Sequence, residues 1–358
     1  MNFKPHDYQA YAIDYIETHP IAAVLLDMGL GKTVISLTAI ADLLFDSFEA
    51  HRILVIAPLR VARDTWPTEI KKWQHLKHLT FAICVGTPKE RKVALMARAD
   101  ITIINRENLQ WLIESSGFPF DYDMVVIDEL SSFKNQNSKR FKSLLKVRPS
   151  VKRIIGLTGT PSSNGLMDLW AEFRLLDLGK RLGRFITEYR NNYFVPDKRN
   201  GQIIYSYKPQ PYAEERIYSQ ISDITISMKS TDHLQMPELI SSEYEVHLSE
   251  DEVARYEELK SDLVLELPDG EITAANAASL TGKFSQLANG AIYSDTGEII
   301  EFHNRKLDAL EDIIESANGK PVLVAYWFKH DLTPIKKRFD VREIKSSKDI
   351  ADWNSGKI

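Results

Sequence analysis

Short apolar runs rich in β-branched residues recur through the first half of the chain, and amphipathic stretches separate them. Each run is continuously apolar, which indicates a strand buried on both faces. Strands that alternate with helices predict an α/β fold, a parallel sheet with helices on both faces, and such sheets bind ligands at the carboxyl ends of their strands. The predicted strands span residues 21–26, 53–57, 80–85, 101–104, 124–127 and 153–157.

The pattern changes after residue 176, where basic and aromatic residues mix and glycine and proline interrupt the periodicity. We interpret residues 177–240 as an insertion of helices and loops. It either contacts a nucleic-acid backbone or forms a small packed subdomain. The sequence thus predicts a first domain over residues 1–176, the insertion, and a further lobe over residues 241–358.

The last part of the chain regains a regular pattern. Ser249, followed three residues later by Glu252, predicts a capped helix over residues 249–263. We also predict a strand-like segment over 244–248, a helix over 305–316 and a buried strand over 322–327. These few elements indicate a second α/β lobe that is only partial.

The segment from Asp27 to Thr33 follows a predicted buried strand and opens an amphipathic run, as a phosphate-binding loop does. Its glycines let backbone N–H groups point at phosphate oxygens, and the N-terminus of the next helix adds partial positive charge. Lys32 would neutralise the β- and γ-phosphates, and Thr33 would hold Mg²⁺. The alternative is a glycine-rich turn that binds nothing, and the strict pattern has glycine where this chain has Leu26. We predict that the ATP-binding residues are Met28, Gly29, Leu30, Gly31, Lys32 and Thr33.

Two carboxylates, Asp128 and Glu129, stand at the end of the predicted strand over residues 124–127. Phosphates held at Lys32 would lie within their reach. Asp128 would hold the Mg²⁺ shell, and Glu129 would orient and deprotonate the water that attacks the γ-phosphate. Such an acidic pair is often only the exit of a buried strand, but together with the loop it predicts catalysis.

Two further polar features lie near the predicted ATP site. Thr158, Gly159 and Thr160 end the next buried strand, either as a polar turn or as a relay that reports the state of the nucleotide to the neighbouring lobe. The amide of Gln9 carries both a donor and an acceptor and can bind the adenine edge, whereas a lone glutamine on a helix is usually only solvated.

Composition narrows the class of protein. A chain of 358 residues with 44% hydrophobic and 27% charged residues is expected to form roughly two globular domains. The single cysteine, Cys84, lies in an apolar run and cannot form an internal disulfide, which fits a reducing compartment. No apolar signal core and no run of about 18 apolar residues exists, so we expect a cytoplasmic protein without a membrane partner.

The net charge of −5 gives no global attraction to nucleic acid, so such a partner must be held locally. Residues 130–167 contain no acidic residue and eight basic ones. We predict that this region contacts a nucleic-acid backbone, and the alternative is a solvated basic surface. Its candidate DNA contacts are Lys134, Lys139, Arg140 and Lys142.

Together the motifs resemble helicase superfamily two, and within it the Swi/Snf group of DNA translocases in its compact bacterial and phage form. The family's D-E-M-G-L-G-K-T is similar to residues 26–33, its A-P to Ala57-Pro58, its D-E-A-H box to residues 128–131 and its L-T-G-T-P to residues 157–161. The resemblance covers nearly the whole chain. The resemblance implies two RecA-like lobes, the first complete and the second partial, with ATP and Mg²⁺ bound in the cleft between them.

The chain departs from this family in three places. Ser131 stands where the family has histidine, and Ser227 and Met228 stand where paired arginines brace the hinge. The last residues are similar to the segment before the family's fifth motif, so the fifth and sixth motifs, with their arginine finger, are absent. Because such an arginine contributes on the order of 10³–10⁵ in turnover, we expect ATP binding with slow hydrolysis. The chain would then be a fragment, or a partner would supply the missing half.

The resemblance implies a translocase whose ATP hydrolysis is stimulated by duplex DNA and coupled to movement along it. Contacts to the phosphate backbone would be sensitive to salt and show little sequence preference. Two alternatives stay open. One is a non-hydrolysing, ATP-gated DNA-binding or interaction module, and the other is a strand-separating RNA or DNA helicase of the same superfamily.

Overall fold

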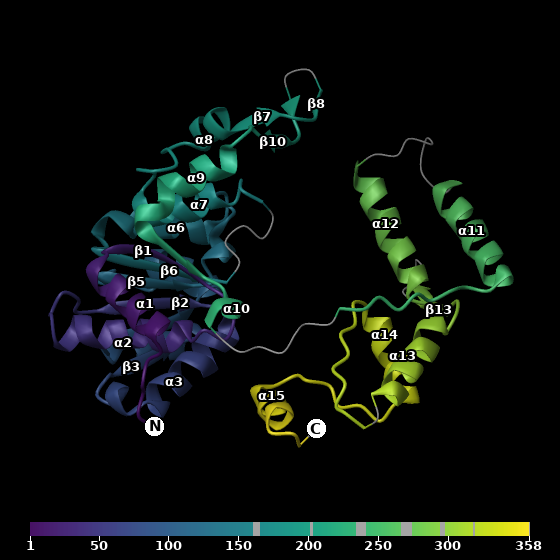
Figure 1. The fold of residues 1–358 in the computed structure, drawn as a ribbon, viewed down its shortest axis with the longest axis horizontal. Helices are drawn as coiled ribbons and strands as arrows, with labels where there is room; N and C mark the ends of the chain where they lie inside the picture. Colours follow the sequence, from purple (N-terminus) through teal and green to yellow (C-terminus); the bar gives the residue numbers. More distant parts are fainter. Residues whose placement is uncertain are drawn as a thin grey trace. The chain divides into compact units, whose positions relative to one another are not determined.

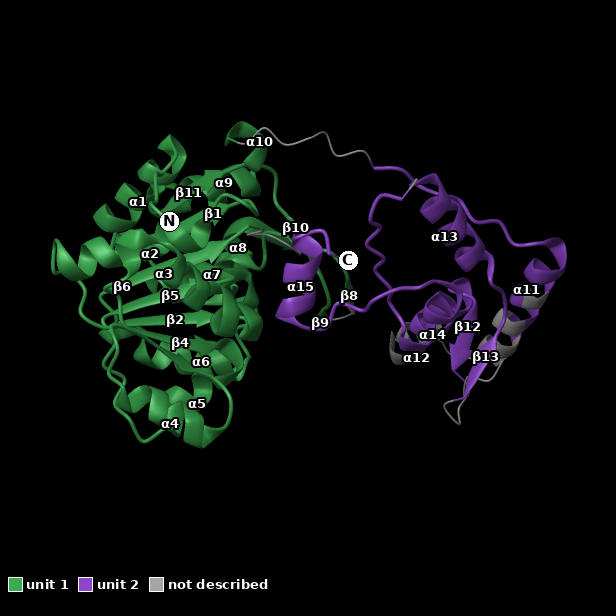
Figure 2. Ribbon diagram, turned by 90° about the horizontal axis from the view of Figure 1, so that it is seen from below, with its two compact units in different colours: residues 1–237 green, residues 238–358 purple. Residues whose placement is uncertain are grey.

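The computed structural model describes residues 1–159, 165–200, 203–233, 241–265, 274–293, 298–317 and 319–357. It divides into two compact units, Met1–Pro237 and Glu238–Ile358, which Figure 2 draws in different colours. The predicted ATP-site residues all belong to the first unit. In the described part of the chain, no helix is long and apolar enough to cross a membrane.

A seven-stranded parallel sheet forms the centre of the first unit, in the order β11-β1-β6-β5-β2-β4-β3. This confirms the predicted α/β class, and six strands match the predicted runs to within one residue at either end. The seventh, β11 (Thr225–Met228), comes from the region interpreted as an insertion and pairs with β1. The other strands are β1 (Ile21–Leu26), β2 (Ile53–Ala57), β3 (Phe81–Cys84), β4 (Ile101–Asn105), β5 (Met124–Asp128) and β6 (Arg153–Thr158).

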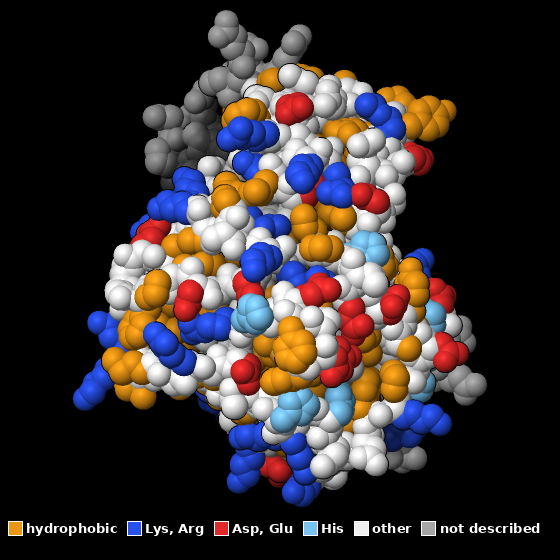
Figure 3. Space-filling view, turned by 90° about the vertical axis from the view of Figure 1, so that its left-hand side faces the viewer, with side chains coloured by type: hydrophobic (Ala, Val, Ile, Leu, Met, Phe, Trp, Pro, Cys, Tyr) orange, Lys and Arg blue, Asp and Glu red, His pale blue; other side chains and the backbone are white. Residues whose placement is uncertain are grey.

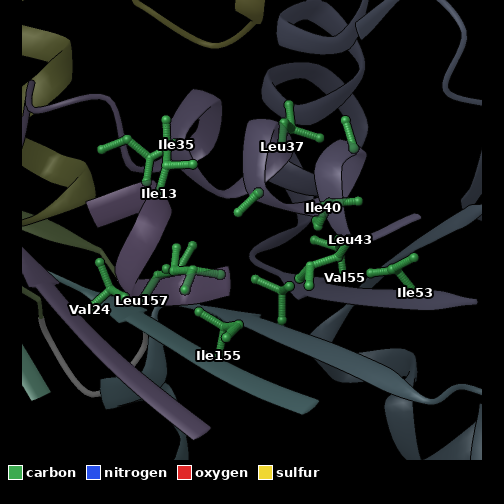
Figure 4. Packing of buried hydrophobic residues seen from close by; sticks show 14 of the residues in the cluster. Ile13, Val24, Ile35, Leu37, Ile40, Leu43, Ile53, Val55, Ile155 and Leu157 are labelled. Carbon is green, nitrogen blue, oxygen red and sulfur yellow. The ribbon is translucent and has the colours of Figure 1, made fainter. Parts of the chain in front are cut away.

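Helices cover both faces of this sheet, because successive strand residues point to opposite sides. On one face Val24 and Val55 pack with α1, α2 and α3, as Figure 4 shows for part of this cluster. On the other face Leu25 and Ile127 pack with α5, α6 and α7, and Figure 1 shows the two helical layers. These helices are α1 (Asp7–Thr18), α2 (Lys32–Phe45), α3 (Trp66–Lys72), α4 (Pro88–Met96), α5 (Leu109–Glu114), α6 (Lys139–Val147) and α7 (Leu169–Asp177).

The residues that follow α7 stay within the first unit. Helices α8 (Ile186–Tyr193) and α9 (Ala213–Ile221) bury Tyr189 and Ile217 in the cluster on the second face of the sheet. Two antiparallel pairs lie between these helices: β7 (Phe194–Pro196) with β10 (Tyr207–Pro209), and β8 (Arg199–Asn200) with β9 (Ile203–Ile204). The short helix α10 (Ser230–His233) follows β11. Much of this region is therefore packed, while Tyr205 and Tyr212 remain exposed.

The second unit has a small core of Leu287, Ile292 and Phe302, against which Tyr256 and Phe284 pack. The predicted capped helix is confirmed as α11, since Ser249 and Glu252 exchange hydrogen bonds of 2.7 and 3.4 Å. The predicted helix over 305–316 is confirmed as α13. The elements of this unit are α11 (Glu250–Leu265), α12 (Ala274–Ala288), β12 (Ala291–Tyr293), β13 (Ile299–Glu301), α13 (Arg305–Ser316), α14 (Lys329–Arg338) and α15 (Ser347–Asn354).

Two predicted strands of the second unit are wrong. Residues 244–248 and 322–327 form no strand, and Leu323 and Trp327 are 66% and 85% exposed. An apolar run becomes a strand only when a neighbour pairs its N–H and C=O groups. The described part of this unit offers one small sheet, in which β12 pairs with β13. Sequence pattern alone cannot show whether such a neighbour exists.

Candidate nucleotide-binding site

The loop between β1 and α2 has the backbone of an anion-binding turn. Gly29 and Gly31 adopt φ values of 86° and 81°, a region that side chains with a Cβ rarely adopt. Gly31 is the N-cap of α2, so the N-terminus of that helix opens directly onto the loop. Met28 is 83% exposed, whereas the side chain of Leu30 is buried in the core. Leu30 therefore offers a ligand its backbone and not its side chain.

The Lys32 ammonium folds back into this loop. Its Nζ donates to the carbonyl oxygens of Leu26 at 2.6 Å and Asp27 at 3.1 Å. Burial lowers the Lys32 pKa, while the charges of Asp128, Glu129 and Asp27 act in the opposite direction. Thr33 follows at the second position of α2 and is half-buried. The Lys32 ammonium is thus held inside the loop by two backbone carbonyl oxygens.

Asp128 and Glu129 end β5, as predicted. Burial raises the pKa of Asp128, and Glu129 raises it further, whereas a hydrogen bond from Trp66 lowers it. That bond joins the Trp66 Nε1 to Oδ2 of Asp128 at 2.8 Å. Asp128 oxygens and the Thr33 hydroxyl are hard donors of the kind that Mg²⁺ takes, so these residues fit the ion.

Glu129 has a positive φ of 68°, which is uncommon for a residue with a side chain. Its Oε1 accepts hydrogen bonds from the hydroxyl of Thr158 at 2.7 Å and from the hydroxyl of Ser131. Ser131 is the second residue of the short 3₁₀ turn Leu130–Phe133, and it stands where the family that the chain resembles has histidine. Two hydroxyls therefore fix Oε1, one of the two carboxyl oxygens of Glu129.

The end of β6 touches the loop directly. A Cβ at Gly159 would lie 3.3 Å from the Leu26 carbonyl oxygen and 3.6 Å from Lys32 Nζ, so the backbone at Gly159 packs closely against the loop. Thr158 is fully buried and bonds Glu129. The residues proposed as a relay thus connect the loop with Glu129. Thr160 and Pro161 of this motif lie outside the described residues.

Gln9 lies against the loop from α1. Its Nε2 donates to the carbonyl oxygen of Leu30 at 3.3 Å, its Oε1 accepts from the backbone N–H of His6, and the residue is 7% exposed. A Cβ at Gly31 would meet that Nε2 at 2.8 Å. The structure therefore places Gln9 beside the loop as a buried residue, not as a solvated one.

The four candidate DNA contacts differ in exposure. Lys139 and Lys142 are exposed on α6, while Lys134 and Arg140 are half-buried. Lys134 Nζ lies 3.5 Å from Oδ2 of Asp168. The guanidinium carbon of Arg140 lies over the Phe133 ring, 5.9 Å from the ring centroid. The face of the molecule in Figure 3 mixes basic and acidic side chains and shows no field of one sign.

Two arginines in the same basic stretch have structural roles instead. Arg148 is buried and donates to the carbonyl oxygens of Val151, Leu175 and Leu176. Arg153, also buried, pairs with Glu49 and bonds the backbone at the end of α1. These two side chains are therefore engaged within the protein, and the contact of the basic stretch with a nucleic-acid backbone stays a prediction.

Three residues near the site were not assigned a role from the sequence. Trp66 holds Asp128, and no local pattern links these two residues because they are far apart in the sequence. Asp27 accepts a hydrogen bond from the backbone N–H of Ser230. Glu172, on α7, is fully buried, and both of its carboxyl oxygens have no hydrogen-bond partner. An acid placed directly between the apolar residues Ala171 and Phe173 was the available signal for Glu172.

Comparison with known proteins gives relatives over most of the chain. Residues 17–289 match the SNF2-related domain family. Protein p41 of Acyrthosiphon pisum secondary endosymbiont phage 1 is 38% identical over 365 residues, which cover 99% of this chain and 79% of the phage protein. An uncharacterized ATP-dependent helicase of Mycoplasma genitalium is 25% identical over 330 residues, covering 89% of this chain and 30% of that protein.

Among solved structures, the Sulfolobus solfataricus SWI2/SNF2 ATPase core in complex with dsDNA matches with a TM-score of 0.54 and 22% identity. The match covers 89% of this chain and 65% of the archaeal one, so the chain spans about two thirds of that core. At this identity the likeness shows the fold, that of a RecA-like ATPase core. Because the family match covers well over half of its residues, the chain belongs to the SNF2-related domain family.

Proposed function

We propose that this chain is a DNA-dependent ATPase that binds ATP and Mg²⁺ at residues 27–33 and couples hydrolysis to movement on duplex DNA. One observation carries the proposal. Lys32, Gly159 and Glu129 meet at the carboxyl ends of β1, β6 and β5, which are neighbours in the sheet. Parallel sheets bind ligands at this edge, and the three residues supply a cation, a close backbone approach and a base.

The loop would hold the phosphates. Its N–H groups and the N-terminus of α2 supply donors, and Lys32 would exchange the carbonyl oxygens of Leu26 and Asp27 for phosphate oxygens. Gln9, already beside the loop, would bind the adenine edge. Thr33 and Asp128 would hold the Mg²⁺, which neutralises charge on the transferring phosphoryl group.

Glu129 would take the proton of the attacking water. Its Oε1 is fixed by Thr158 and Ser131, and Oε2 would face the phosphates. A positioned base of this kind contributes roughly 10²–10⁴ in rate. Since Thr158 and Gly159 connect this base with the loop, we propose that they couple the state of the nucleotide to the rest of the chain.

Duplex DNA is the proposed partner because the archaeal ATPase core of the same fold was solved in complex with dsDNA. Lys139 and Lys142 are exposed and free to reach phosphates, and Lys134 and Arg140 lie beside them. Contacts to the backbone predict affinity that falls steeply with salt and depends little on sequence. The arginine that completes the transition state would come from a partner or from a longer form of the chain.

The test is ATP hydrolysis by the purified chain at low salt, with and without duplex DNA, with Lys32→Ala as the blank. Stimulation by DNA above the blank supports the proposal. ATP binding with turnover equal to the blank would instead favour an ATP-gated module, or a motor that needs a partner. Unwinding of a duplex in the same buffer would favour a strand-separating helicase.

A further inference from the structure

Asp27 joins the phosphate-binding loop to the segment that leaves the first unit. It follows β1, and residues 229 and 230 follow β11, which pairs with β1 in the register Leu26↔Met228. The backbone N–H of Asp27 donates to the Met228 carbonyl oxygen at 3.2 Å. Its Oδ2 accepts from the backbone N–H of Ser230 at 2.9 Å and from the Ser230 hydroxyl at 3.4 Å. The carboxylate therefore caps the first turn of α10.

Helix α1 makes a second link between the same two segments. Gln9 donates to the Leu30 carbonyl oxygen in the loop. The preceding residue, Tyr8, stacks on His233 of α10 with ring centroids 4.7 Å apart. The loop and α10 are thus held together through Asp27 and, independently, through adjacent residues of α1.

Lys32 also holds Asp27, from the inside of the loop. Its Nζ donates to the Asp27 carbonyl oxygen, so one residue is bonded by Lys32 on its main chain and by Ser230 on its side chain. A phosphate would compete with that carbonyl for the ammonium. Once Lys32 turned to the phosphate, Asp27 would still be held by its main-chain bond to Met228 and by the bond from Ser230 to its side chain.

We propose that Asp27 is a positioning residue, which keeps the phosphate-binding loop in its binding geometry by anchoring it to Ser230 and so links nucleotide binding to the exit segment of the first unit. The inference rests on the proposed ATP binding. The anchor lies directly after Ser227 and Met228, which stand where the family that the chain resembles has paired arginines.

Linkage gives the proposal a measurable consequence. If the anchor favours the binding geometry, then ATP must favour the anchor by the same factor. ATP should therefore slow hydrogen exchange in residues 225–233, and breaking the anchor from the Ser230 side should weaken ATP binding. A hydrogen bond to a carboxylate is worth roughly tenfold or more in an equilibrium constant.

The decisive variant is Ser230→Pro. Proline is compatible with the first helical position and removes the N–H that Asp27 accepts together with the Ser230 hydroxyl, and Lys229 before it is not helical. Ser230→Ala is the matched control, because it removes the longer hydroxyl bond and keeps the N–H. ATP affinity is measured by calorimetry on the full chain, and exchange of the 225–233 peptide is compared with and without ATP and Mg²⁺ within each variant.

We expect wild type and Ser230→Ala to bind ATP alike and to show slower exchange with ATP. Ser230→Pro should bind roughly tenfold more weakly and show no change in exchange. Equal ATP affinity and an equal exchange response in the two variants would overturn the proposal. Asp27→Asn, which keeps the shape and loses the charge, should bind ATP several-fold more weakly, and a wild-type response from it would overturn the proposal even if the proline variant did not fold. Failure of the wild type to bind ATP would refute the proposed function instead.

Discussion

The indole Nε1 of Trp66 donates a 2.8 Å hydrogen bond to Oδ2 of Asp128, so the first residue of α3 holds the acid at the end of β5. The two residues are 62 positions apart in the chain. They meet because β2, which precedes α3, lies next to β5 in the sheet. The bond orients the carboxylate proposed to bind Mg²⁺ and lowers its pKa against the effect of burial.

Trp66→Phe should reduce ATP turnover roughly tenfold, since it removes the bond that orients Asp128 and keeps an aromatic ring in the core. Loss of the bond also raises the pKa of Asp128 further. The acid side of the pH–rate profile should therefore move to higher pH, because Asp128 takes up its proton earlier as the pH falls. Trp73→Phe is the control, as Trp73 donates to Glu69 and not to the site. If Trp66→Phe left the pH–rate profile unchanged, Trp66 would not be the residue that orients Asp128.

Glu129→Gln should lower turnover by a factor of roughly 10²–10⁴ and leave ATP binding nearly intact, because it removes the base and not the phosphate contacts. Lys32→Ala should lose ATP binding itself. Measuring ATP affinity and turnover for both variants separates the two roles. If both lost affinity to the same extent, Glu129 would be a binding residue and not the base.

Thr158→Val should lower turnover roughly tenfold with little change in ATP affinity, because it keeps the buried shape and removes the hydroxyl that fixes Glu129 Oε1. Thr158→Ser keeps the donor and should stay near the wild type. Steady-state kinetics of Thr158→Val and Thr158→Ser measure this difference. Equal rates in the two variants would show that the hydroxyl does not position the base.

Glu172→Gln should stabilise the first unit at neutral and alkaline pH. Burial raises the pKa of Glu172 to about 9, and the charges of Asp168 and Glu129 add to this effect, with Lys134 opposing it. Stability from this protonated carboxyl is fully present below its ordinary pKa near 4.5 and is lost as the pH rises through about 9.

Unfolding by denaturant at several pH values measures that effect. The gain from Glu172→Gln should be small near pH 4.5 and reach about 2 kcal/mol or more by pH 8. Glu214→Gln, on the exposed side of α9, is the control and should show no such trend. A difference between the Glu172 variant and the wild type that does not change with pH would refute the raised pKa.

Replacing Lys139 and Lys142 together with glutamine should weaken duplex binding at low salt and reduce the slope of log affinity against log salt. Each lost phosphate contact lowers the magnitude of that slope by about 0.9. Lys152→Gln, which is also exposed, is the matched control. Fluorescence anisotropy over a salt series gives the slope. An unchanged slope in the double variant would place the DNA contacts elsewhere.

The strands and the loop could be predicted because their signals are local. A strand buried on both faces must be apolar at every position, and a phosphate-binding turn needs glycines at fixed places before a helix, as Gly29 and Gly31 show. β11 was missed because its four residues, Thr225–Met228, are neither long nor continuously apolar. The run over residues 322–327 was misassigned for the opposite reason, since its apolar character needs a partner strand that the described second unit does not supply.

The α/β class, the phosphate-binding loop and the two acids at the end of β5 follow from local sequence, because each depends on residues that are neighbours in the chain. The hydrogen bonds from Trp66 to Asp128, from Thr158 to Glu129 and from Ser230 to Asp27 depend on the folded chain. These bonds join residues brought together by the strand order of the sheet. The same packing buries the side chain of Arg148 and leaves that of Lys142 exposed to water.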